Sequence, residues 1–234
     1  MSFASRFKRL RGSLAESAGT IVFGMEDGTV SIFGLIFGVA ATTTNAGTVL
    51  IAGASGAVAA AVSMMAGAFL DAETTSDETK AKRARLQAAL SANTASICAE
   101  LPAQLTAAGL TQGQSAALTG AVMHDRQALD GLLLALHGSP EAPVSASEQA
   151  LWMLIADFAA AAVPILPFVF LSVAQARVIS AGVTIALLIS LGVGRALIAG
   201  RGIVRTMAET VAIGIAAALA GVAISVVIDR FFTG

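Results

Sequence analysis

Residues 205–228 read RTMAETVAIGIAAALAGVAISVVI, and this stretch decides the fold class. No charged residue lies between Glu209 and Asp229. The hydrocarbon core of a bilayer is about 30 Å thick, so a helix needs roughly 20 mainly apolar residues to cross it. The stretch meets that length. We therefore expect it to be a transmembrane helix.

Four other segments have the same length and apolar character, and they lie at residues 18–43, 48–70, 149–172 and 177–198. The whole chain is 56% hydrophobic and 12% charged, with a mean hydropathy of +0.81. This composition is typical of a protein whose main solvent is lipid. The sequence predicts an all-α polytopic membrane protein with five transmembrane helices.

A polar region separates the second and third spans. From Asp71 to Ala99 it contains no Gly or Pro, so we expect the helix of the second span to continue through it and to end at Pro102. Two shorter helices are expected near 112–122 and 125–137. The predicted parts of the chain are a cytoplasmic N-terminal segment (1–17), transmembrane helices 1 and 2 (18–70), a cytoplasmic helical domain (71–148) and transmembrane helices 3 to 5 (149–234).

The distribution of Lys and Arg predicts the orientation, because loops that stay in the cytoplasm carry the positive charge. With the N-terminus in the cytoplasm, all 14 of these residues except Arg177 and Arg230 lie on the cytoplasmic side. Five crossings then place the C-terminus outside the cytoplasm. The N-terminal segment is expected to form either a short interfacial helix or a solvated tail.

Composition also excludes several classes of function. The net charge of −1, the absence of Tyr and the single Trp152 argue against a nucleic-acid-binding protein. Cys98 is the only cysteine, which excludes an intramolecular disulfide and a multi-cysteine zinc site. No nucleophile, base and orienting residue occur at a recognisable spacing, so we expect neither an enzyme nor a bound cofactor.

Ionisable residues inside membrane helices are costly and usually face a partner or a wet cavity, so they are candidates for function. The candidates are Glu26 and Asp27 in the first span, Asp157 in the third and Glu209 in the fifth. A rise of about 1.5 Å per residue places Asp27, Asp157 and Met64 of the second span at similar depths. Two carboxylates and a thioether suit iron(II) or manganese better than calcium or magnesium.

Each candidate also has a simpler interpretation. Met64 in an apolar helix is more often a packing residue than a ligand. Glu26 points about 100° away from Asp27 around the helix and could reach the headgroup layer instead. Glu209 follows Arg205 by four residues, so a surface ion pair explains it as well as a proton relay does. Asp157 has no such neighbour.

Four short motifs resemble those of the vacuolar iron transporter family, and they are Glu26-Asp27-Gly28, Gly38-Val39-Ala40-Ala41, Ser63-Met64-Met65-Ala66-Gly67 and Val163-Pro164-Ile165-Leu166-Pro167-Phe168. The resemblance extends over nearly the whole chain and includes the five-span layout. It implies a homodimer that exports iron(II), manganese or a related ion in exchange for protons. The family's helix 1 aspartate falls on Asp27 and its helix 2 methionine on Met64.

The sequence departs from the family pattern at two places. Gly56 stands where the family often has a glutamate, two turns before the methionine, and Asp157 is our candidate to supply the missing carboxylate. In the family, many glutamates of the cytoplasmic helices hold metal, whereas Glu100 is the only glutamate here between residues 86 and 140.

Two hypotheses follow for the function. The first is a proton-coupled exporter of iron(II) or manganese, with Glu26, Asp27, Met64 and Asp157 as metal ligands and Glu209 as a possible proton relay. The second is a membrane scaffold or regulatory protein of the same fold without coupled transport. The expected partners are a divalent metal ion, protons, the lipid bilayer and a second copy of the chain. The expected location is a bacterial plasma (inner) membrane, because no organelle-targeting pattern occurs.

Overall fold

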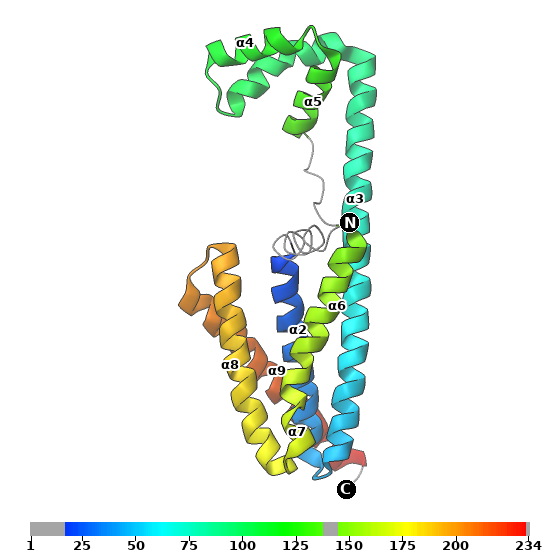
Figure 1. The fold of residues 1–234 in the computed structure, drawn as a ribbon, viewed down its shortest axis with the longest axis vertical. Coiled ribbons are helices and arrows are strands. Elements are labelled where there is room, and N and C mark those ends of the chain that lie inside the picture. Colours follow the sequence, from blue (N-terminus) through cyan, green and yellow to red (C-terminus); the bar gives the residue numbers. More distant parts are fainter. Residues whose placement is uncertain (1–16, 138–144, 233–234) are drawn as a thin grey trace, which may run out of the picture. The chain divides into compact units, whose positions relative to one another are not determined.

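The computed structural model describes residues 17–137 and 145–232, and all secondary structure within them is helical (Figure 1). Five helices are long and apolar enough to cross a membrane, which confirms the predicted number of spans. They are α2 (Ala18–Thr42), the first part of α3 (Ala46–Ala107), α6 (Ala146–Ile165), α8 (Val173–Ala199) and α9 (Ile203–Phe232). The N-terminal helix or tail expected before residue 17 lies outside the described residues.

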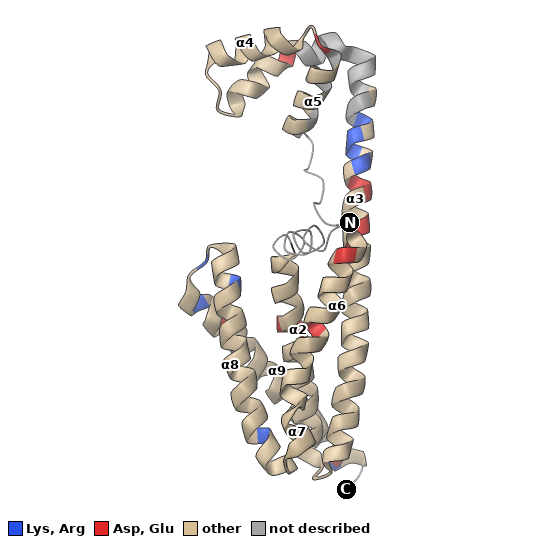
Figure 2. Cartoon of the chain, in the orientation of Figure 1, with Lys and Arg blue, Asp and Glu red and all other residues tan. Residues whose placement is uncertain are grey.

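The chain forms two compact units. Met1–Asp71 and Pro143–Gly234 make up the first, which we call the membrane unit, and Ala72–Ala142 make up the second, which we call the insert unit. Few charged residues occur on the helices of the membrane unit, as the mainly tan ribbons of Figure 2 show. Apolar side chains such as Leu219 (65% exposed) cover the outer face of α9, as expected of a helix in contact with lipid.

Helix α2 is the centre of the membrane unit, because it packs against α6, α8 and α9. Glycines allow this close packing. The backbone of α2 at Gly34 touches the backbone of α9 at Gly221, and Gly24 faces the sulfur of Met153 on α6. Small residues let membrane helices approach closely, since dispersion contacts rather than water exclusion hold such helices together.

The third span differs from the prediction. It was expected to run from 149 to 172, but α6 ends at Ile165 and the short helix α7 (Pro167–Phe170) follows. Pro164 and Pro167 lack the N–H groups that would continue the hydrogen-bond ladder. The buried Ser180 hydroxyl of α8 donates to the Pro164 carbonyl at 2.8 Å, which satisfies a backbone group where the helix ends.

The loop between α2 and α3 is short and is closed by a side-chain hydrogen bond. The Oδ1 atom of Asn45 accepts a 2.8 Å hydrogen bond from the Gly47 amide, so its side chain caps the start of α3. Within the membrane unit, Val49 and Ala57 of α3 are buried in one apolar cluster with Ile32 and Ile36 of α2.

The insert unit contains the rest of α3 with α4 (Gln112–Val122) and α5 (Arg126–His137), which confirms the two short helices. Pro102 was expected to end the long helix, and this was wrong, because α3 continues to Ala107. Leu101 and Leu105, on either side of Pro102, are fully buried in a small core with Leu133. Burial of these leucines favours one more helical turn despite the proline.

Candidate functional site

Asp157 is the most unusual side chain of the membrane unit. It is 0% exposed, and within the described residues neither of its carboxylate oxygens has a hydrogen-bond partner. It lies on α6 against Gly28 of α2, where an added methyl group would be 2.8 Å from Oδ1 and closer still to the Asp157 carbonyl. Gly28 thus leaves the room that this carboxylate occupies. An acid buried in this way is costly, which favours a functional role.

Asp27 precedes Gly28 and is half-buried. It lines a cavity of about 430 Å³ whose other polar side chains are Glu26, Arg195 and Thr210. No side-chain hydrogen bond or ion pair of Asp27 is found in the part of the chain that the structure describes. The Asp157 carboxylate on α6 lies against Gly28, the residue that follows Asp27 on α2. The structure therefore brings these two predicted residues together.

Glu26 lies in the same cavity but has partners. Its Oε2 atom is 3.3 Å from a guanidinium nitrogen of Arg195 on α8, and its Oε1 atom accepts a 3.0 Å hydrogen bond from the Thr210 hydroxyl on α9. The Glu26 side chain is 13% exposed. These contacts connect α2 to both neighbouring helices inside the membrane unit.

Met64 lines a second cavity, also of about 430 Å³, together with Asp71, Gln149 and Met153. Gly19 and Phe23 of α2 border both cavities, which are otherwise lined by different residues. The structure therefore places Met64 in a compartment next to the one that Asp27 lines. Across the second cavity, the Gln149 amide donates to the Thr20 hydroxyl at 3.2 Å, which joins α6 to the start of α2.

Glu209 forms a 2.9 Å ion pair with Arg205, and its side chain is 38% exposed. The described residues that line the Asp27 cavity do not include Glu209. A half-exposed pair at this spacing is the arrangement expected of a helix surface. Nothing in this geometry connects Glu209 to Asp27.

Gly56, where the resemblance led us to expect a glutamate, is packed against Leu35 and Ile32 of α2. A side chain at residue 56 would have to displace Leu35. The surroundings of Gly56 on the α2 side are therefore apolar and filled.

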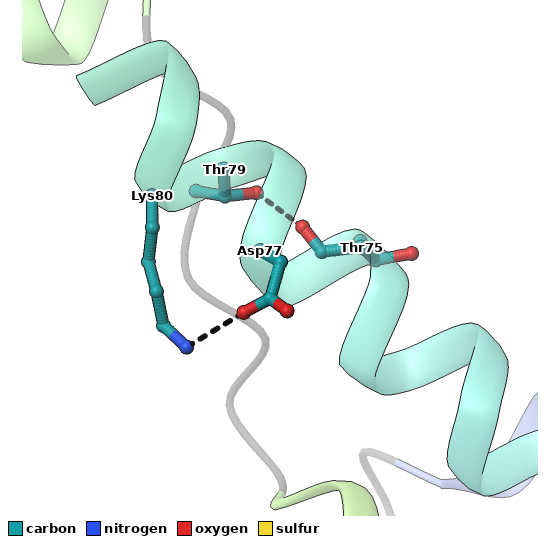
Figure 3. Close-up of polar contacts among 4 residues, drawn as sticks. All are labelled: Thr75, Asp77, Thr79 and Lys80. Atoms are coloured by element: carbon teal, nitrogen blue, oxygen red, sulfur yellow. Dashed lines mark hydrogen bonds and ion pairs between the residues drawn. The ribbon is translucent and has the colours of Figure 1, made fainter. Parts of the chain in front are cut away.

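One ion pair of the insert unit joins Lys80 to Asp77 on α3. The Lys80 ammonium lies 3.0 Å from Oδ1 of Asp77, and the two side chains are 72% and 73% exposed. Figure 3 shows this pair and the hydrogen bond that the Thr79 hydroxyl donates to the Thr75 carbonyl. No group of three or more His, Cys, Asp or Glu side chains that could hold a metal ion occurs within residues 17–137 and 145–232. A surface pair of this kind stabilises a helix by at most about 0.5 kcal/mol.

Three residues that surround the predicted acids were missed from the sequence. Arg195 lies inside the predicted fourth span, and an ionisable residue there was a signal for an intramembrane partner. Thr210 and Met153 gave no such signal, because a threonine or methionine in an apolar helix is ordinary. Their contacts to Glu26 and Gly24 depend on how α6 and α9 pack against α2.

Comparison with known proteins gives one finding about the family. A family model described as the VIT family matches residues 18–226, which include four of the spans in full, most of the fifth and the residues that line both cavities. No curated protein matches the chain.

Proposed function

Because this chain belongs to the VIT family, whose members transport metal ions, we propose that it carries iron(II) or manganese across the membrane. The observation that supports this most is the pair of acids at the contact between α2 and α6. Asp27 is unpaired within the described residues and lines a cavity, and Asp157 is buried behind Gly28. Two carboxylates within a membrane favour a cation over any other ligand.

We further propose that the metal leaves the cytoplasm in exchange for protons. The cavity lies where α2 begins and α8 ends, and the Lys and Arg distribution assigns both positions to the cytoplasmic side. A carboxylate that takes up a proton loses the charge that holds a metal ion. Competition between a proton and a divalent cation for the same oxygens is therefore sufficient for coupled exchange.

The remaining assignments rest on the same proposal. Glu26 and Met64 supply further oxygen and sulfur ligands, the latter as the ion passes the neighbouring cavity. Glu209 is the weakest assignment, since its ion pair with Arg205 accounts for its position.

We also propose a homodimer in a bacterial plasma membrane, with the N-terminus and the insert unit in the cytoplasm and the C-terminus outside it. The competing proposal is a membrane scaffold of the same fold, which would not transport metal.

Uptake by proteoliposomes separates the two. We expect the purified protein to move Mn²⁺ across the bilayer. An imposed proton gradient should accelerate this movement when it drives protons in the direction opposite to the Mn²⁺ flux. The measurements are radioactive Mn²⁺ uptake and the fluorescence of a pH-sensitive dye in the lumen. Uptake no faster than in protein-free vesicles would favour the scaffold. Uptake that does not respond to the gradient would contradict the proposed proton exchange and leave the proposed metal transport standing.

Replacing Met64 with alanine tests the second cavity. We expect a partial loss, about threefold in kcat/KM, that is larger for iron(II) than for manganese, because a thioether is a soft ligand. Met65→Ala is the matched control, since Met65 is the adjacent residue on α3 and does not line the cavity. Equal losses in both variants, or equal losses for both metals, would assign Met64 to packing.

A further inference from the structure

The cavity beside Asp27 contains its own cation. Arg195 enters it from α8, four residues before that helix ends at Ala199, and its guanidinium meets Glu26. The polar groups that line the cavity are thus two carboxylates, one guanidinium and one hydroxyl. The remaining lining is apolar, with Val22, Phe23, Val30, Ile198 and Ile213. In such surroundings charges interact more strongly than in water.

The ion pair between Arg195 and Glu26 has the geometry of an exchangeable contact. It consists of one nitrogen–oxygen contact of 3.3 Å, whereas a strong pair of this kind has two parallel bonds of about 2.8 Å. The Arg195 side chain is 37% exposed, and within the described residues the guanidinium forms no other hydrogen bond. Arg195 therefore has room to withdraw from Glu26 without breaking a larger network.

The charges of the cavity suggest what Arg195 does. Glu26 and Asp27 carry two negative charges when both are ionised, and Arg195 balances one of them. A divalent ion bound by Asp27 would lie in the same cavity as the guanidinium and be repelled by it. Once Arg195 withdraws, Glu26 becomes an additional oxygen ligand, and its second oxygen is already oriented by Thr210.

We propose that Arg195 and the transported divalent ion compete for Glu26, so that Arg195 sets the affinity of the cavity and helps to expel the ion. This inference rests on the proposed function and assigns to it a specific affinity-setting residue. A built-in competitor weakens binding and accelerates release, which a transporter needs because the ion must also leave.

The test is a double-mutant cycle on the full-length protein, with Mn²⁺ binding measured by calorimetry and Mn²⁺ uptake by proteoliposomes. Arg195→Gln should bind Mn²⁺ about tenfold more tightly, because a repelling charge is gone and Glu26 is free. Its uptake should have a lower KM together with a lower kcat, since release becomes slow. Arg195→Met, which keeps an unbranched apolar stem and removes the charge, should have the same effect and replaces the Gln variant if that variant does not fold.

The other variants should not raise the affinity for Mn²⁺ as Arg195→Gln does. Glu26→Gln should bind about tenfold more weakly, because it loses a ligand and leaves Arg195 unpaired beside Asp27. The double variant should lie between the two single variants, and Arg195→Lys should stay close to the parent. Arg177→Gln, the same substitution near the other end of α8, is the matched control and should leave binding and uptake unchanged.

The outcomes separate this inference from the proposed function. If the parent protein transports Mn²⁺ but Arg195→Gln and Arg195→Met bind it with unchanged or lower affinity, the inference is overturned. Arg195 would then only stabilise the packing of α8 against α2. If the parent neither binds nor transports Mn²⁺, the proposed function fails first.

Discussion

Asp27→Asn should abolish coupled metal transport while the protein still folds. The amide has nearly the same shape as the carboxylate but carries no charge and does not titrate. It therefore removes both the attraction for a divalent ion and the site at which a proton could compete. Replacing even a group that only supports a metal ligand costs about 10- to 100-fold in affinity or activity, so loss of a direct ligand should reduce Mn²⁺ uptake by about 100-fold or more.

The comparison is made in proteoliposomes with an opposing proton gradient, and size-exclusion chromatography establishes that the variant is folded. Asp77→Asn is the control, because this carboxylate is 73% exposed in the insert unit and pairs with Lys80. It should transport like the parent. If Asp27→Asn carries Mn²⁺ as fast as the parent under the same gradient, the cavity beside Asp27 is not the transport site.

The hydrophobic pattern was sufficient to predict the main elements of the fold. Five runs of apolar residues specify five helices, because a backbone in lipid must satisfy its own hydrogen bonds and a helix does this locally. Prediction failed where the outcome depended on packing. The prolines divide the third span after Ile165, and a buried leucine pair carries α3 past Pro102.

The candidate site was predictable in part for the same reason. An acid in an apolar run stands out, so Asp27 and Asp157 could be identified from the sequence alone. That they lie together depends on Gly28, whose missing side chain lets the two helices meet at that point. The partners of Glu26 come from residues 169 and 184 positions away along the chain, and no local pattern indicates such contacts.

Asp157→Asn should lower transport and leave stability unchanged or higher. In the parent both carboxylate oxygens are buried without a hydrogen-bond partner among the described residues, an arrangement that costs the folded protein free energy. An amide of the same shape costs less to bury. If the acid is retained as a metal ligand, its removal should reduce Mn²⁺ uptake about tenfold, while the thermal unfolding midpoint stays the same or rises.

Thr184→Val is the matched control for this result. The Thr184 hydroxyl on α8 is likewise fully buried without a hydrogen-bond partner in the described part of the chain, and valine has its shape. Removing a costly polar group there should also preserve or raise the unfolding midpoint, but transport should stay at the level of the parent. A variant Asp157→Asn that loses stability and transport together would make the residue structural. One that keeps full transport would show that transport does not require Asp157.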